Sequence, residues 1–597
     1  MSTTSPPGFL EGALDRVIHE THKTKPLLPL YLHLILSSIF PIFIAAHASL
    51  RRPSSAAPVK KNKKSRRITD QDSDTEEESS SPIETLTTTD AILFPILAGG
   101  TLTGLYVTIK WLEDPSILNK ILGYYFNWIG TFFTFKLVRD GLYLIRSLVF
   151  PTQFSRGGTV YKYNATSDSF DVTGNNGATL EDVNTAGAFG RPFRALPFLA
   201  KARRRLYYKA TCTLNMRKPL SSSKISFSIT ALDIVAALIS ALLSFTSVYL
   251  GKTPWYLTNL QGFSFCYGSL QFMTPGTSAT GSLLLSLLFF YDIYMVFYTP
   301  MMVTVATKLE VPIKLLFPRP DDGTCPKPIG ALPGSEEMEQ YLKCLAKKRT
   351  MAMLGLGDIV VPGIMVAFAL RFDLYRFYLK MKQQGKAGAT EASEERHGKD
   401  QKARPTYTPA RGMWAERFYT AKTLWSPALK AKSFPKPYFK ATMVGYVLGM
   451  IATLLVMQVW QHAQPALLYL VPGVLISFWG MALSKREIKL LWNYDEAEED
   501  KEKEKKEEAD KKNKQESKSK EEESTKKEGA EEKKSTKSKD DAKDNKEKDP
   551  DRPVFSFNIY VPSTRKPFRE TESTPSTEAH GDSATEDTLQ ASNSAAS

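Results

Sequence analysis

Long apolar segments alternate with polar connections along most of the chain. Nine segments each hold about 20 mainly apolar residues, the length a helix needs to cross the hydrocarbon core of a bilayer. They cover residues 27–48, 91–112, 117–135, 229–250, 255–273, 276–298, 351–372, 441–461 and 465–484. Apolar residues continue from the third segment to Phe150, where the chain either lies in the membrane interface or lengthens the helix. The pattern predicts an all-α, polytopic membrane protein with nine transmembrane helices, in a domain of residues 27–484.

Overall composition hides this pattern. The mean hydropathy of −0.25 would suit a soluble protein. From about Lys485 onward, however, the chain is almost free of apolar runs and dilutes a strongly hydrophobic body. Lys and Glu alternate between Glu496 and Lys548, a composition that cannot bury a core and predicts disorder or a single solvated helix. The short apolar island at 554–561 is either a docking peptide or a chance cluster, of which the chance cluster is favoured.

The first apolar segment has a second interpretation. Lys23 and Lys25 precede it and the small residues Ala46 and Ala48 end it, as in a cleaved signal peptide. The run is longer than a usual signal core, and two arginines follow at 51–52, which favours an uncleaved span.

Lysine and arginine predict the orientation of the chain. The connections after the first, third and seventh segments hold roughly 35 of these residues, and those on the other side, with the N-terminal tail, hold roughly a dozen. We therefore expect a lumenal N-terminus, a cytosolic C-terminus and a lumenal connection between the sixth and seventh segments. The expected organisation is a lumenal tail at 1–26, disordered inserts at about 51–89, 153–191 and 380–411, a lumenal insert at 318–350, and a charged, disordered cytosolic tail at 485–597.

Two chemical consequences follow from this orientation. The sequon at Asn164 lies on the predicted cytoplasmic side and should stay unmodified. Cys325 and Cys344 share the lumenal loop, where they either form a disulfide or remain free thiols. The seven histidines are scattered, and no metal site or cofactor is expected.

Two aspartates lie within predicted spans. A carboxylate near the centre of a spanning helix costs about 2.5 to 3.5 kcal/mol, so a function is expected for it. Asp292 lies about six residues before the end of the sixth segment, and Asp358 about seven after the start of the seventh. At a rise of roughly 1.5 Å per residue both lie about 10 Å from the same side, on neighbouring antiparallel helices. Apolar residues after Thr299 would move Asp292 deeper by up to about a turn.

Facing carboxylates in a poorly solvated site share a single proton near neutral pH. One can then take a proton from water while the other gives one to a carbonyl oxygen, which is what hydrolysis of a peptide bond requires. The alternatives are the pathway of an ion or proton-coupled transporter, and a structural pair satisfied by neighbouring polar groups. On the carboxylates alone transport is favoured, because most membrane carboxylates serve it.

The surrounding residues change this balance. Gly355 and Gly357 flank Leu356 just before Asp358 and let the backbone approach a neighbour or a substrate. In the last span, "QPALLYLVPG" (464–473) has one proline at the helix start and another in its interior, which frees backbone groups inside the membrane region.

Three motifs now occur in order. "FFYDIYMVF", "MLGLGDIVVPG" and "QPALLYLVPG" resemble the Tyr-Asp, Gly-x-Gly-Asp and Pro-Ala-Leu signatures of the GxGD intramembrane aspartyl proteases. "DIVVPG", "FPILAGGTLTGLY" and "MMVTVATKLEVPIKLLFP" are similar to the signal peptide peptidase branch rather than to presenilin. The resemblance covers about residues 86–487, interrupted by long inserts.

The resemblance implies a nine-helix protease of the endoplasmic reticulum membrane. Its partners would be membrane lipid and the transmembrane helices of substrates, namely type II or tail-anchored proteins and remnant signal peptides. Homo-oligomerisation stays open and nucleic acid is not expected. The implied catalytic pair is Asp292 and Asp358. The residues implied to shape the site or bind substrate are Tyr291, Gly355, Leu356, Gly357, Gln464, Pro465, Ala466 and Leu467.

Overall fold

The computed structural model describes residues 28–57, 85–173, 206–319, 351–387, 405–496 and 555–560, with short gaps in the second, third and fifth ranges. Cys325, Cys344, the N-terminal tail and most of the charged tail lie outside these residues. The expectations for them, including the disulfide, therefore remain predictions.

A helix of 18 residues or more lies in each of the nine predicted segments. Within the described ranges, five stretches are long and apolar enough by themselves to cross a membrane: α2, α4, α10, α17 and Leu429–Trp460, which contains α16. The nine helices are α2 (Leu28–Ala48), α4 (Thr88–Trp111), α5 (Ser116–Val149), α8 (Ala231–Tyr249), α9 (Trp255–Phe272), α10 (Ser278–Phe297), α13 (Gly357–Ala387), α16 (Pro437–Trp460) and α17 (Leu467–Ser484).

Short elements join these helices. The short helices are α11 (Met301–Lys308), α14 (Glu416–Tyr419), α15 (Pro427–Lys432), α18 (Ile488–Trp492) and a 3-10 helix at Lys422–Leu424. The strands are β1 (Thr85–Leu86), β2 (Gln153–Arg156), β3 (Thr159–Asn164), β4 (Ser169–Thr173), β5 (Lys209–Arg217), β6 (Ser222–Thr230), β7 (Thr274–Pro275), β8 (Lys314–Pro318), β9 (Met351–Gly355) and β10 (Phe555–Tyr560). They form four small sheets, ordered β1-β7, β10-β5-β6, β2-β3-β4 and β8-β9. The chain is thus mostly helical rather than purely all-α.

For the third predicted segment the structure decides between the two alternatives, and the seventh differs from expectation. The third continues without a break to Val149, so its apolar continuation lengthens the helix. The seventh does not begin as a helix, because residues 351–355 form β9 and pair antiparallel with β8. Gly355 and Gly357 are poor helix formers, and β8 supplies a hydrogen-bonding partner for this stretch.

Disorder was wrongly expected for several described stretches. The strands β2, β3 and β4 form a sheet whose aromatic residues Phe154, Tyr161 and Tyr163 make a small buried cluster. Phe154 stands opposite Tyr161 in the register, and their rings stack with centroids 5.1 Å apart. α13 extends to Ala387, and the island taken for a chance cluster contains strand β10. The strands β2, β3 and β4 pair with their neighbours in the sequence, whereas β10 pairs with β5 from a distant part of the chain.

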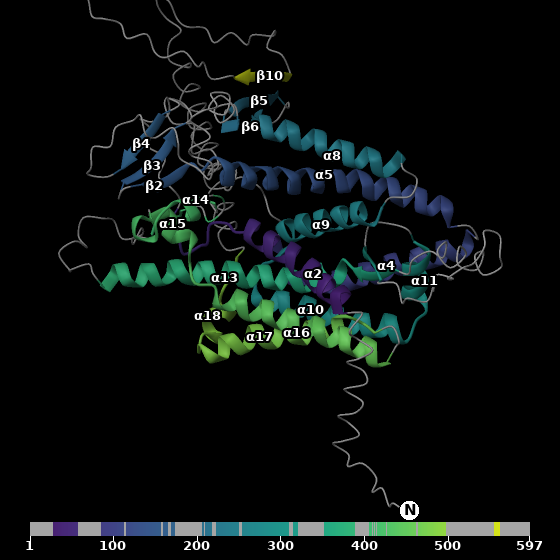
Figure 1. Ribbon diagram of the computed structural model, residues 1–597. Coiled ribbons are helices and arrows are strands. Elements are labelled where there is room, and N and C mark those ends of the chain that lie inside the picture. Colours follow the sequence, from purple (N-terminus) through teal and green to yellow (C-terminus); the bar gives the residue numbers. More distant parts are fainter. Residues whose placement is uncertain are drawn as a thin grey trace, which may run out of the picture.

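The core of the described body lies around α13. Residues 361–374 of this helix are all buried, and α2, α9, α10, α16 and α17 pack against it (Figure 1). Only a central helix is enclosed in this way, because lipid-facing helices keep one apolar face exposed. α10 and α13, which carry the two aspartates, are therefore neighbours at the centre of the bundle.

Glycines bring α16 and α17 into backbone contact. A Cβ atom on Gly473 would lie 2.5 Å from the carbonyl oxygen of Gly445, and one on Gly449 would lie 2.8 Å from that of Tyr469. Small residues allow such close approach between membrane helices, where van der Waals packing drives association. This contact sets the position of α17, which begins with the Pro-Ala-Leu segment.

Buried charges hold the chain that follows α17. Glu496 forms ion pairs of 2.8 Å with both Arg51 and Arg371, and Glu487 pairs with Arg376 at 2.6 Å. Burial alone would raise the pKa of Glu496, but the two arginines hold it below its usual range. The segment after α17 is thereby fastened to α13 and to the end of α2.

The glycine contact predicts a sharp difference between two alanine variants of α17. Gly473→Ala should destabilise the purified protein by about 1 to 3 kcal/mol, because its methyl group would collide with the backbone of α16. Gly480→Ala is the matched control, since nothing lies within 4 Å of its Cβ position. Thermal unfolding in detergent should show a clear loss of Tm for Gly473→Ala alone; equal Tm values would contradict the close contact.

Candidate active site

Asp292 is buried in α10, with 5% of its surface exposed. The helix begins at Ser278, where the side chain of Thr277 accepts a hydrogen bond from the backbone N–H of Thr280. It ends five residues after Asp292, before Pro300, which cannot continue it. The aspartate thus lies near the end of α10 that faces the connection to β8.

Asp358 is the second residue of α13 and is half-buried. A helix N-terminus favours a carboxylate because its free N–H groups carry partial positive charge. The prediction that Asp358 lies seven residues inside a helix was wrong, because β9 forms the first part of that segment. A Cβ atom on Gly355 would lie 3.3 Å from Oδ2 of Asp358, so this glycine leaves room for the carboxylate.

The two carboxylates lie close together. The charge of Asp292 acts on Asp358, and the helices that carry them pack against each other. Like charges at short range in an apolar surrounding favour a state with one proton between them. The structure therefore brings the two sequence-predicted aspartates into one site.

The Pro-Ala-Leu segment meets Asp292 directly. The backbone N–H of Leu467 donates a hydrogen bond of 3.2 Å to Oδ2 of Asp292. Leu467 is the first residue of α17 and Ala466 its N-cap, so this N–H is one of the donors that a helix start leaves without a partner in its own helix. Pro465 and Leu467 are buried, and half-buried Gln464 precedes them.

Tyr291 and Leu356 contact helices beside the aspartates. The Tyr291 ring lies against Gly99 of α4, 3.5 Å from the position of a Cβ there. Leu356 packs against Gly262 of α9, whose Cβ would lie 3.3 Å from it. Gly357 has no neighbour within 4 Å of its Cβ position, so no contact explains it.

Asn259 of α9 is a residue that the sequence reasoning missed. Its side-chain amide donates a 2.8 Å hydrogen bond to the carbonyl of Leu316 and accepts one of 2.7 Å from the N–H of the same residue. Asn259 therefore binds the outer edge of β8. An amide in a membrane span was the available signal, since a polar group there needs a partner.

This contact determines which edge of the two-stranded sheet is open. Residues of antiparallel strands alternate between pairs that exchange hydrogen bonds and pairs that do not. Leu316 turns both backbone groups toward Asn259, so its partner Met353 turns its own away from β8. The outer edge of β9, which leads into Asp358, thus offers backbone groups at Met353.

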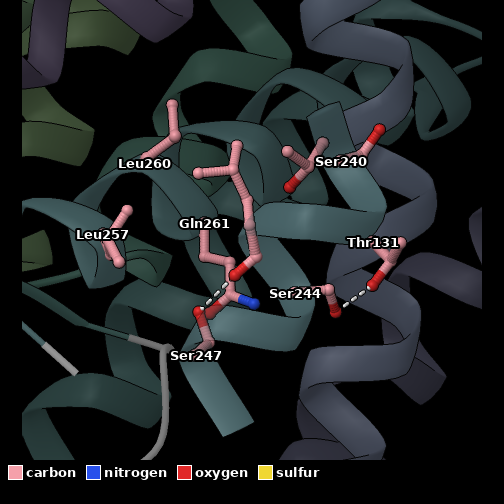
Figure 2. A pocket seen from close by; sticks show the side chains of 9 residues that line it. Thr131, Ser240, Ser244, Ser247, Leu257, Leu260 and Gln261 are labelled. Carbon is pink, nitrogen blue, oxygen red and sulfur yellow. Dashed lines mark hydrogen bonds between the residues drawn. The ribbon is translucent and has the colours of Figure 1, made fainter. Parts of the chain in front are cut away.

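A small cavity lies elsewhere, between α5, α8 and α9 (Figure 2). Most of its hydroxyl groups bond to one another or to backbone, as in the 2.5 Å contact of Thr131 with Ser244, but the buried hydroxyl of Thr134 has no partner among the described residues. Its volume of about 10 Å³ suits a single water and not a peptide. The lining residues, which include neither aspartate, are Thr131, Thr134, Ser240, Leu243, Ser244, Ser247, Leu257, Leu260 and Gln261.

Metal chemistry has no visible basis at the aspartates. Across the described ranges, no three His, Cys, Asp or Glu side chains gather in a way that would hold an ion. The polar groups that the structure gives the site include the two carboxylates, the backbone N–H of Leu467 and the hydroxyl of Tyr446, which donates to the backbone carbonyl of Asp358 at 3.4 Å.

Comparison with known proteins agrees with these features. The sequence profile described as signal peptide peptidase matches residues 78–498. Human signal peptide peptidase is 25% identical over 414 residues, 69% of this chain and 75% of the relative. The mouse signal peptide peptidase is 26% identical over the same shares. Intramembrane protease 2 of Caenorhabditis elegans is 31% identical over 276 residues, 45% of each chain. No solved structure matches the chain.

These observations define a class of protein. The chain is a multi-pass membrane enzyme, an aspartic intramembrane peptidase. Within that class it belongs to the signal peptide peptidase family, and the resemblance found in the sequence motifs is confirmed.

Proposed function

We propose that Asp292 and Asp358 are the catalytic pair that hydrolyses peptide bonds within transmembrane segments. The observation that carries this proposal is the approach of the two carboxylates, together with the N–H of Leu467 on one of them. The family match covers both aspartates and favours the protease over the transporter that the carboxylates alone would also suit.

In the proposed mechanism, water attacks the carbonyl carbon of the scissile bond. The ionised aspartate takes a proton from the water while the other gives its proton to the carbonyl oxygen, which forms a tetrahedral diol. As the C–N bond breaks, the first aspartate protonates the leaving nitrogen and the second takes a proton from the diol. The pair returns to its starting state without a covalent intermediate.

The Leu467 hydrogen bond assigns roles within the pair. A backbone N–H that donates to a carboxylate stabilises its charged form. Asp292 is therefore proposed as the ionised base and Asp358 as the acid. Pro465 and Ala466 act by placing this N–H, and Gly355 by leaving space for the carboxylate of Asp358.

The substrate is proposed to add as a strand to the outer edge of β9. A membrane helix hides its peptide bonds in its own hydrogen bonds, so a cleavable stretch must unwind and find other partners. Asn259 covers β8 at Leu316, whereas Met353 turns its backbone outward. Main-chain pairing of this kind recognises an extended peptide with little regard to its sequence.

The proposed setting is the endoplasmic reticulum membrane. All nine long helices span the bilayer in this proposal, with a lumenal N-terminus and a cytosolic C-terminus, as the basic connections predict. The substrates are signal peptides left in the membrane and the spans of type II or tail-anchored proteins. The names of the human and mouse signal peptide peptidases support the first of these classes.

Replacement of either aspartate tests the catalytic pair. Asp292→Ala and Asp358→Ala should each lower cleavage of a model signal peptide by at least about 10³-fold, because neither half can both activate water and protonate the carbonyl. Mass spectrometry of the products measures cleavage, and Tm in detergent checks folding. Asp90→Asn, at an exposed helix cap, is the control and should remain active. Full activity of either Ala variant would rule out the pair.

Replacement of Asn259 tests the open edge. Asn259→Leu removes both hydrogen bonds to Leu316 and frees the outer edge of β8, so the cleavage rate should fall roughly tenfold to a hundredfold and additional peptide bonds should be cut. The fragment masses of the model peptide report the bonds cut. A merely destabilised enzyme would give less product at the same bond.

Asn119→Leu is the matched control for this prediction. Asn119 also donates to a backbone carbonyl beyond α10, but that carbonyl belongs to Lys308 of α11 and not to a strand of the β8 and β9 sheet. It should leave the cleaved bond unchanged. An unchanged cleavage pattern in Asn259→Leu would count against substrate pairing on β9 while leaving the test of the two aspartates unaffected.

A further inference from the structure

The strand β10 lies more than 300 residues along the chain from the strand it pairs with. We propose that the outer edge of β5 is a docking site for an extended peptide, and that the chain's own segment Phe555–Tyr560 is its resident ligand. The charged tail is then fastened to the membrane domain at both ends. This inference stands apart from the proposed catalytic mechanism.

The register of β10 on β5 is continuous. Six consecutive pairs run antiparallel from Phe555 opposite Met216 to Tyr560 opposite Thr211. The sheet order β10-β5-β6 places β10 on the edge of β5 that β6 leaves free (Figure 1). A chance approach of two segments would not give six successive pairs without a bulge.

A third strand would stabilise the hairpin of β5 and β6. Its two strands pair over nine residues each. A two-stranded hairpin is at best marginally stable in water, and an open edge invites pairing with another chain. β10 covers six of the nine positions of β5 and so both completes the sheet and blocks its edge.

The docking site is fixed relative to the membrane helices. β6 runs directly into α8, and the backbone N–H of its last residue, Thr230, donates a 2.7 Å hydrogen bond to Asp233. Asp233 in turn forms a 2.7 Å ion pair with Arg139 of α5 and accepts a hydrogen bond from Tyr143. A docked tail is therefore held at the end of the α5 and α8 pair.

The tail leaves the body from a second fixed point. Glu496 is buried between Arg51 and Arg371, and 58 residues (497–554) separate it from β10. Even a continuous helix of that length would reach roughly 85 Å, so the connection is long enough. A tethered ligand has an effective concentration in the millimolar range, and a segment of weak intrinsic affinity then stays docked.

A disulfide cross-link tests the docked register. Cys212 of β5 stands opposite Ile559, so Ile559→Cys in the full chain should form a 212–559 disulfide on mild oxidation. Asn558→Cys is the matched control, because residue 558 stands opposite Thr213 in the register and successive residues of a strand alternate between its two faces. Mass spectrometry of the cross-linked peptides should show at least tenfold more product for Ile559→Cys. Equal yields, or no 212–559 product, would overturn the proposal.

A second pair of cysteines tests the register at the next position of the two strands. In a Cys212→Ser chain, Tyr560→Cys with Thr211→Cys should restore cross-linking, because these residues also face each other. Adding Ser556→Pro and Phe557→Pro to Ile559→Cys should lower the yield to that of the control. Alternate residues of a strand point toward the neighbour, so one of two adjacent prolines must remove a hydrogen bond to β5.

Mixed populations separate docking within a chain from exchange between copies. Two differently tagged forms of the Ile559→Cys protein are purified together and oxidised. Cross-links confined to single chains support the resident ligand. A 212–559 bond that joins the two tags as often as it closes one chain would show a second copy on this edge and overturn the proposal.

Discussion

The start of α17 is what allows a carboxylate to remain inside α10. Asp292 is buried in an apolar helix, and the backbone N–H of Leu467 is the donor that reaches it. In a medium without water, such a partner decides whether a charge can be accommodated. The position of α17 in turn depends on the backbone contact of Gly473 with Gly445 and on the ion pairs after the helix. Packing far from the aspartate thus supports it.

The other aspartate depends on a different set of contacts. α9 holds β8 through Asn259, β8 pairs with β9, and β9 leads through Gly355 to Asp358. The two sides of the site are therefore built by separate parts of the bundle, which meet where α10 packs on α13. A change in α9 therefore acts on the Asp358 side of the site through β8 and β9, and not through the Leu467 contact.

Much of the helical architecture could be read from apolar length alone. A run of about 20 apolar residues has few stable alternatives in a bilayer, so the nine segments each contain a long helix. Some short strands were missed because they lie in polar or apolar stretches of another expected type, and one because its partner is remote. Phe154 and Tyr161 lie in a polar insert, β9 was counted as part of an apolar span, and β10 pairs with a strand from the other half of the chain. The local pattern of apolar and polar residues does not indicate which strands will pair.

The candidate site, like the fold, could be predicted in part from the sequence and in part only from the structure. The sequence by itself determined that this is a helical membrane protein, that two aspartates lie within its apolar segments, and that three motifs follow in order. These features can be recognised in the sequence because a charged residue inside an apolar run, a glycine or a proline is apparent from its neighbours alone. Only the tertiary structure decided that Leu467 donates to Asp292, that Asn259 covers one edge of the β8 and β9 sheet, and that the tail returns to β5. These contacts join groups from separate elements, and their geometry exists only once the helices have packed.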